Sequence, residues 1–362
     1  MKSRELTQEK AKLMEDVKLF GSLSSLETWI TDLKNMEYYQ DLPLKKIIIP
    51  GAHHAGLQHV KGSLMYKLGL FKILGVNDFY QLSEEFQNQF IDLISVSQLS
   101  STKELLEQGV RYLDCRLTTD PDSGDIVISN LFLSNHLVSD FLKDLKAFMT
   151  NHPDEVIILD IRDDFQNDYP RPGYSVTQAE IDYQISLYID DNLILDPILL
   201  DEPIKNVKGD IFLTGDMSLL FSYNRAYYID DWPTTNDPAP QTVVENVFSY
   251  VRNKQIQDLI TIINRVDPYV SPQNEEVKTS FQFHFHNPDE QQVYSHEKIA
   301  LIDPANLLRM ADITNQKFLD KIKSVVKDYS HLNIVNLDKI SEDLSTKIIN
   351  LNEDLKVKFK RQ

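Results

Sequence analysis

The segment Ile47–Gly56, which reads IIIPGAHHAG, gives the strongest indication of the architecture. Its three isoleucines are β-branched and predict a short buried strand. Pro50 and Gly51 predict the end of that strand, and two adjacent histidines, His53 and His54, follow at once. In an α/β barrel, the residues just past the carboxyl end of a strand lie at the catalytic face. His53 is therefore the leading candidate for a chemical role.

The composition is that of a globular protein with a large core. The chain has 362 residues, of which 42% are hydrophobic and 25% charged, and its single cysteine, Cys115, excludes an internal disulfide. The net charge of −18 argues against nucleic acid and against non-specific adsorption to anionic lipid. No apolar signal segment and no apolar run of membrane-spanning length is found. We expect a cytoplasmic protein, although an effector or toxin secreted without a classical signal would look the same.

Strand patterns and helix patterns alternate along most of the chain. Strands are expected at 46–49, 110–117, 125–129, 155–161, 210–214, 280–286 and 332–337. Helices are expected at 7–19, 26–33, 138–149, 178–189, 242–263, 304–329 and 341–355. This alternation is typical of a mostly parallel α/β fold, and at this length it predicts a (β/α) barrel with insertions.

Several expected strands end in a residue suited to phosphoryl transfer. These residues are His53, Arg116, Arg162 and Asp338, and Asp114 shares a strand face with Arg116 at a spacing of two. A histidine can take the proton of an attacking hydroxyl. An arginine can neutralise charge on phosphoryl oxygens, and a carboxylate can orient the histidine ring. Each residue also has a structural interpretation. His53 can be a core histidine, Asp114 and Arg116 can form a salt bridge, and Asp338 can be a capping residue.

The motif IIIPGAHHAG resembles the IPGTHDSG motif of the phosphatidylinositol-specific phospholipase C X-domain family. The resemblance runs from about Trp29 to the C-terminus. Further segments resemble the same family in the same order, namely LETWITDL at 26–33, LLEQGVRYLDCRL at 105–117, NHPDEVIILDI at 151–161, WPTTN at 232–236 and LNIVNL at 332–337. The family implies a distorted TIM-type barrel, here residues 41–362, preceded by an N-terminal helical extension, residues 1–40.

The resemblance also implies an activity, the cleavage of glycerophospholipid headgroup esters without a cofactor. His53 matches the general base of the family, and Asp338 matches the carboxylate that partners it. Asp114 and Arg116 match the "DxR" pair, whose arginine takes the place of calcium in the calcium-dependent branch. Arg162 falls where some bacterial members carry a lysine. The implied partners are a phospholipid or inositol phosphate and a transient membrane surface, with no nucleic acid.

The sequence departs from the family pattern at two catalytic positions. His54 stands where the family has Asp or Asn. The second catalytic histidine of the family, its general acid, aligns with Ser129–Asn130, and loss of a general acid costs about 10²–10⁴ in rate. His136 lies a few residues further on and is a candidate replacement, and His54 is another.

Other functions therefore stay open at this point. One is a catalytically impaired X-domain that binds an inositol phosphate, a lipid or a protein, for which Arg162 and His54 are candidate ligand contacts. His284, on the expected strand 280–286, is a candidate to line the barrel interior as a substrate contact or as a core histidine. Another is a hydrolase dependent on a divalent cation such as Ca²⁺, held by the histidine pair with Asp114, Asp160 or Asp163. The side chains of adjacent histidines are expected to diverge, which argues against that reading.

Overall fold

The structure is a computed structural model, and it describes a large part of the chain. The described residues are 20–64, 92, 95–130, 132–164, 173–194, 199, 202–215, 223–224, 227–229, 260–264, 308, 311–312, 315–316, 319–320 and 334–359. The expected strand 280–286, with His284, lies outside the described residues.

The centre of the fold is a ladder of parallel strands. Its members are β1 (Ile49–Ala52), β3 (Tyr112–Thr119), β6 (Ile157–Asp163), β7 (Ile211–Gly215), β8 (Tyr223–Asn224), β9 (Tyr227–Ile229), β10 (Ile260–Asn264) and β11 (Ile334–Leu337). The order along the ladder is β8-β7-β6-β3-β1-β11-β10-β9, and every neighbouring pair is parallel. This is the cyclic order of an eight-stranded barrel. Within the described residues β8 and β9 are not paired, so the sheet is open there.

An antiparallel extension leaves the ladder at the end of β3. β4 (Ile126–Ser129) pairs with residues 117–119 of β3, and β5 (Phe132–Leu137) pairs with β4. β2 (Val60–Leu64) adds to the outer edge of β5. This extension carries Ser129 and His136 at the end of the sheet where the parallel strands finish.

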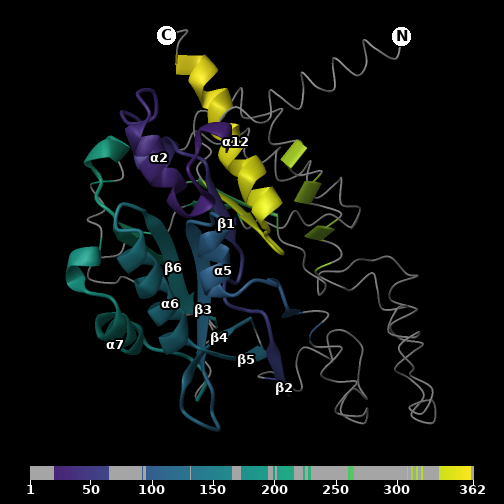
Figure 1. The fold of residues 1–362 in the computed structure, drawn as a ribbon. Coiled ribbons are helices and arrows are strands. Elements are labelled where there is room, and N and C mark those ends of the chain that lie inside the picture. Colours follow the sequence, from purple (N-terminus) through teal and green to yellow (C-terminus); the bar gives the residue numbers. More distant parts are fainter. Residues whose placement is uncertain are drawn as a thin grey trace, which may run out of the picture.

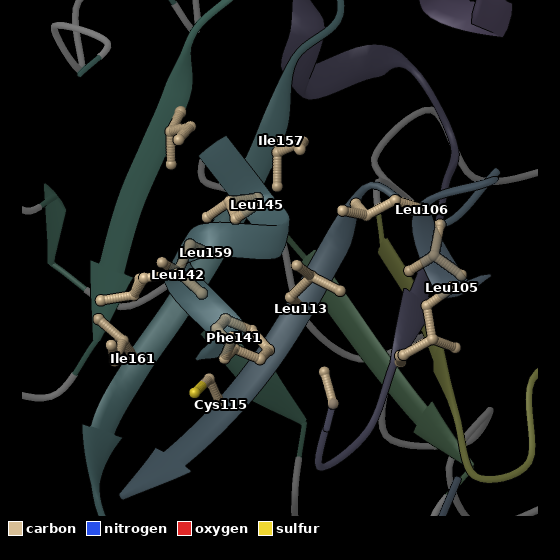
Figure 2. Close-up of a cluster of buried hydrophobic side chains, with 14 of the residues drawn as sticks. Leu105, Leu106, Leu113, Cys115, Phe141, Leu142, Leu145, Ile157, Leu159 and Ile161 are labelled. Atoms are coloured by element: carbon tan, nitrogen blue, oxygen red, sulfur yellow. The ribbon is translucent and has the colours of Figure 1, made fainter. Parts of the chain in front are cut away.

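The outer face of the sheet is covered by amphipathic helices. α5 (Thr102–Glu107), α6 (Val138–Asn151) and α7 (Gln178–Tyr188) lie on that face. Figure 2 shows α6 across β3 and β6, with apolar side chains of the helix against apolar side chains of both strands. The odd-numbered residues of β3 and β6 point into this core, among them Leu113, Cys115, Leu159 and Ile161. Alternation along a strand therefore sends the even-numbered residues to the opposite face.

A second apolar cluster fills the other end of the sheet. It joins α2 (Trp29–Asn35) to the first residues of the parallel strands, through side chains such as Trp29, Ile158 and Phe212. In Figure 1, α2 and α12 (Glu342–Phe359) lie at the end of the sheet opposite the β4–β5 hairpin. Helix α2 thus contributes to the core of the sheet, and the division of the chain at residue 40 stays a prediction. Short 3₁₀ helices at Phe20–Ser22, Leu26–Thr28, Leu44–Lys46, Asp191–Leu193 and Ile204–Asn206 complete the described elements.

The expected elements that fall on described residues are confirmed in type, with two corrections. The expected helix 7–19 and most of the expected helix 304–329 lie outside the described residues. Strands β3 and β6 begin two residues later than their patterns indicate, and β1 begins three residues later, at Ile49. The expectation that Pro50 and Gly51 end this strand is wrong, because β1 runs through both residues to Ala52. The expected helix 242–263 is wrong at its end, because Ile260–Asn264 is the strand β10 between β9 and β11. A strand covered on both faces is a continuous apolar run, and periodicity alone cannot separate such a run from a buried helix. The other residues of that expected helix lie outside the described ones.

Helices able to cross a bilayer were sought among the described residues, and none has the length and apolar content required.

Candidate active site

The parallel register brings the functional side chains to one level at the carboxyl ends of the strands. Ala52 of β1 pairs with Leu337 of β11 and with Leu113 of β3, so His53, Asp338 and Asp114 each follow at the next position. The amide of His53 donates to the carbonyl of Leu337 at 3.1 Å. Residues that are more than 200 positions apart in the chain therefore share one layer.

His53 lies between two carboxylates at different distances. Its Nδ1 is 2.7 Å from Oδ1 of Asp338, which is a hydrogen bond, while its Nε2 is 3.7 Å from Oδ2 of Asp114, which is not. His53 is 2% exposed and both aspartates are fully buried. With Nδ1–H donated to Asp338, the lone pair of Nε2 is left facing the site, which is the tautomer that a general base requires.

Asp114 links this histidine to two arginines. Its Oδ1 lies 3.2 Å from Nη2 of Arg162 and 3.7 Å from Nε of Arg116. The guanidinium of Arg162 is buried, whereas that of Arg116 is 14% exposed. The pair Arg116–Arg162 is in register on β3 and β6, one step of two residues beyond the pair Asp114–Asp160. The site thus places a base and two cations around one carboxylate.

A buried glutamine holds the two strands that carry the base and its partner. Nε2 of Gln98 donates to the carbonyls of His53 and Leu337 at 2.7 and 2.9 Å, and its Oε1 accepts from the amide of Ile340 at 3.2 Å. Asn315 donates to the carbonyl of Asp338 at 2.8 Å. Sequence reasoning missed both residues. Gln98 lies in no expected element, and Asn315 lies in the expected helix 304–329 but in no recognisable motif.

The neighbour of the base, His54, has a left-handed backbone with φ of 49°. This conformation is uncommon outside glycine but is enriched in histidine, asparagine and aspartate. It turns the imidazole of His54 back onto that of His53, so that the ring centroids are 3.7 Å apart with 30° between the planes. The expected divergence of the two side chains is therefore wrong. His54 is 3% exposed and belongs to the site.

The position of the missing second histidine is occupied by a polar pair. The hydroxyl of Ser129, the last residue of β4, donates to Oδ2 of Asp164 at 2.9 Å, and both residues are buried. His136, on β5, contacts the turn that follows the histidine pair. Its Nδ1 is 3.0 Å from the carbonyl of Gly56, and its ring lies 6.2 Å from that of Phe141 in α6.

Two further side chains at this level bear on the chemistry. Asp160 accepts a hydrogen bond from the hydroxyl of Tyr112 at 2.7 Å, beside Asp114. Burial, with Asp114 and Asp160 nearby, raises the pKa of the Cys115 thiol well above its usual range. Cys115 also points to the helix side of β3, so it is not a nucleophile for this site.

The group His53, His54 and Asp114 meets the first requirement of a metal site, with ligand atoms within 4.8 Å of one another. Calcium does not fit this donor set. Ca²⁺ takes six to eight oxygen ligands, whereas this group offers two imidazoles and one carboxylate whose other oxygen faces Arg162 and Arg116. The reaction is therefore derived without a calcium ion.

Comparison with known sequences finds distant relatives. PI-PLC X domain-containing protein 2 of Homo sapiens is 29% identical over 133 residues, which are 36% of this chain and 42% of that protein. Variant-surface-glycoprotein phospholipase C of Trypanosoma cruzi is 30% identical over 144 residues, which are 38% of this chain and 36% of that protein. The match thus spans about two-fifths of the length of these curated relatives. No protein-family model matches the chain.

Comparison with solved structures covers far more of the molecule. A variant of the phosphatidylinositol-specific phospholipase C from Staphylococcus aureus aligns with a TM-score of 0.56 at 14% identity, over 90% of this chain and 96% of that one. The phosphatidylinositol-specific phospholipase C from Listeria monocytogenes aligns with a TM-score of 0.55 at 16% identity, over 91% and 99% of the two chains. At these identities the likeness is one of fold. Together the comparisons confirm the resemblance of this chain to the PI-PLC X-domain family, in sequence over somewhat more than a third of its length and in fold over about nine-tenths of it.

Proposed function

We propose that this chain is a phosphoric diester hydrolase of the phospholipase C type, which cleaves the headgroup of a phosphatidylinositol-like glycerophospholipid. One observation carries the proposal. A buried histidine is held by one carboxylate at 2.7 Å and faces a second, arginine-bound carboxylate at 3.7 Å. This combines a general base with cations for a phosphate, all at the carboxyl ends of parallel strands. The relatives named as phospholipases C support the same reaction class.

In the proposed reaction, the 2-hydroxyl of the inositol attacks phosphorus while Nε2 of His53 takes its proton. A bond forms between that oxygen and phosphorus, and the bond from phosphorus to the diacylglycerol oxygen breaks. Asp338 stabilises the imidazolium that forms. Arg116, the more exposed of the two arginines, neutralises charge on the phosphoryl oxygens. The products are a cyclic inositol phosphate and diacylglycerol, and the reaction needs no metal ion.

The leaving oxygen also needs a proton, and the chain offers three candidate donors. His136 and His54 are the candidates from the sequence. The buried pair Ser129–Asp164 is a third. Its support is its position at the end of β4, where the family carries its acid.

The second candidate function is a binding module without turnover. The observation that favours it is the same substitution: Ser129 stands in place of a histidine, and its hydroxyl is engaged by Asp164. Such a module would use Arg116 and Arg162 to hold an inositol phosphate or the headgroup of a phospholipid at a membrane surface.

The test is release of water-soluble phosphate ester from phosphatidylinositol vesicles, with and without chelator. We expect wild type to turn over in both conditions and His53→Ala to lose at least about 10³ in rate. The matched control is His152→Ala, because His152 is a partly exposed histidine that pairs with Glu27 at 3.3 Å, outside the site. No turnover by wild type, together with saturable binding of inositol phosphate that is lost in Arg116→Gln, would favour the binding module instead.

A further inference from the structure

The stacked histidines His53 and His54 form a donor group that the proposed reaction does not use in full. Consecutive side chains on an extended backbone point to opposite faces, but the left-handed φ of His54 brings both imidazoles to one side at a centroid distance of 3.7 Å. Both rings are at least 97% buried, and both lie beside the buried carboxylate of Asp114. The proposed reaction requires one imidazole at this point, and the chain supplies two.

The gap between His53 and Asp114 has the size of a metal site. Nε2 of His53 is buried, and no described residue hydrogen-bonds to it. Its distance of 3.7 Å from Oδ2 of Asp114 is too long for a hydrogen bond. Two ligand atoms that are each about 2.1 Å from one ion and are separated by this distance subtend an angle of about 124° at the ion, roughly 14° wider than the tetrahedral angle. The ligand atoms of all three residues lie within 4.8 Å of one another, so a side-chain shift of under about 1 Å closes the set.

The surroundings of the group match the outer shell of metal sites. A histidine that binds a metal usually donates its other ring N–H to a carboxylate, and Asp338 accepts from Nδ1 of His53 at 2.7 Å. Nη2 of Arg162 lies 3.2 Å from Oδ1 of Asp114, and Oδ2 is the oxygen that lies 3.7 Å from Nε2 of His53. Three carboxylates, those of Asp114, Asp160 and Asp338, and two guanidinium groups lie at this level, so the side-chain charges do not repel a divalent cation.

We propose that His53, His54 and Asp114 bind a divalent transition-metal ion of the zinc type. Two imidazoles and one carboxylate suit zinc and its neighbours and not calcium or magnesium, which prefer oxygen ligands. The bound ion takes the lone pair of His53 Nε2, the same pair that the base uses. The bound ion therefore inhibits turnover. This inhibition rests on the proposed function, whereas the metal binding itself does not depend on it.

Binding is tested on the full chain after chelator treatment, with Co²⁺ as the spectroscopic probe and Zn²⁺ as competitor. We expect one equivalent of Co²⁺ with a visible absorption band of a four- or five-coordinate site, displaced by Zn²⁺. His54→Asn keeps a residue that tolerates the left-handed backbone, and we expect it to weaken Zn²⁺ affinity by at least about tenfold, since even outer-shell partners are worth that much. His152→Asn, outside the site, should change nothing.

Asp114→Asn is expected to weaken binding similarly, with circular dichroism reporting whether that variant folds. If it does not fold, His54→Asn decides alone. The proposal is overturned if wild type takes up no stoichiometric Co²⁺, or if the Zn²⁺ affinity of His54→Asn equals that of wild type.

Zn²⁺ should also inhibit phosphatidylinositol turnover at the concentration that displaces Co²⁺, and chelator should reverse the inhibition. Tight Zn²⁺ binding without any turnover would support the metal site and contradict the proposed function. Turnover without Zn²⁺ binding would support the proposed function and contradict the metal site.

Discussion

The orientation of His53 depends on one short contact and one long one. Asp338 is at hydrogen-bond distance from Nδ1, and Asp114 is about 1 Å further from Nε2. The short contact fixes the ring and its tautomer, and the long one leaves Nε2 available to a substrate proton. The two aspartates thus have different roles although both are fully buried. Asp338 acts through the histidine, and Asp114 links the base to the arginines.

Replacement of Asp338 by asparagine tests this division. We expect Asp338→Asn to lower kcat on phosphatidylinositol by about 10²–10⁴, because the amide no longer selects the Nδ1–H tautomer or stabilises the imidazolium. The matched control is Asp312→Asn, which removes a surface carboxylate that pairs with Lys339, the residue after Asp338. Equal rates for Asp338→Asn and the control would contradict the role of Asp338.

The proton donor can be identified with a substrate whose leaving oxygen is replaced by sulfur. A thiolate leaves without protonation, so a variant that lacks the general acid recovers on this substrate while a variant that lacks the base does not. We expect Asp164→Asn to lose about 10²-fold or more on the natural ester and to approach wild type on the sulfur analogue. His136→Ala is the comparison. Recovery in His136→Ala and not in Asp164→Asn would assign the acid to His136.

At the scale of elements, two capped helix N-termini and one buried ion pair stabilise the helices and strands around the site. α5 and α7 each begin with a capping box, Ser101 with Glu104 and Thr177 with Glu180. Such a box satisfies amide groups that have no partner inside the helix. The ion pair Arg111–Glu155 joins the start of β3 to the segment before β6 at 2.7 Å, with both side chains fully buried.

The capping box of α5 predicts a dependence of stability on pH. Hydrogen bonds from the amide and hydroxyl of Ser101 lower the pKa of Glu104 below its usual value of 4.5. A lowered pKa in the folded state contributes stability that is present above the unfolded-state pKa and is lost as pH falls through the folded-state pKa. We expect Glu104→Gln to cost under about 1 kcal/mol in the free energy of unfolding at pH 7, since the side chain is exposed. The cost should vanish towards pH 3.

The control for that prediction is Glu107→Gln, which removes the same charge from the same helix but no capping contact. Denaturant unfolding at pH 7, 5, 4 and 3 measures both variants. A loss in Glu104→Gln that persists unchanged at pH 3 would contradict the capping interpretation.

Loss of the buried ion pair should be far more costly. The guanidinium of Arg111 donates to Glu155 and to the carbonyls of Leu106, Val110, Leu26 and Glu27. Glu155→Gln leaves this buried cation without its counter-charge, and we expect a loss of about 3–5 kcal/mol in the free energy of unfolding, towards the lower end if the amide keeps one hydrogen bond. Glu27→Gln, whose side chain is 45% exposed, is the control and should cost under about 0.5 kcal/mol. Denaturant midpoints of the two variants that coincide would contradict the prediction.

The elements also show what sequence reasoning can and cannot find. His53, Arg116 and Asp338 are predicted from their places at or near the ends of recognisable strands, and parallel register brings strand ends together. Asp114 is predicted from its spacing of two from Arg116 and from the family resemblance. The stacking of His54 on His53 is not predicted, because a left-handed backbone conformation does not change the hydrophobic periodicity of the sequence. Gln98 lies in a segment without a periodic pattern, and Asn315 lies in an expected helix but in no motif. The apolar run of β10 does not by itself distinguish a strand from a helix.

At the scale of the whole molecule, the site depends on contact between β1 and β11, the first and last described strands in chain order. His53 and Asp338 are separated by 285 positions in the chain and meet because β1 lies beside β11. The last helix, α12, reinforces that contact. The buried side chain of Asn352 bonds both the amide and the carbonyl of Ile48, at 2.8 and 2.9 Å. One amide group thus joins the C-terminal helix to the segment that leads into β1.

Asn352→Ala should therefore destabilise the whole fold. The change leaves the buried amide and carbonyl of Ile48 without these partners, and we expect a loss of about 2–4 kcal/mol in the free energy of unfolding. Thr346→Ala on the same helix removes an exposed hydroxyl bonded to the carbonyl of Glu342 and should cost under about 0.5 kcal/mol. Thermal and denaturant unfolding measure both. A loss in Asn352→Ala no larger than that in the control would show that α12 does not stabilise β1.

The central claim is that His53 is the base for attack by the inositol hydroxyl. The most direct test is to record the phosphorus-31 NMR spectrum of phosphatidylinositol while it is incubated with the protein in the presence of a chelator. The account predicts that wild type produces the resonance of a cyclic inositol phosphate, that this resonance precedes any open phosphomonoester, and that His53→Ala produces neither. A phosphatidic acid resonance, or a cyclic ester formed equally by wild type and His53→Ala, would contradict attack by the inositol hydroxyl with His53 as base.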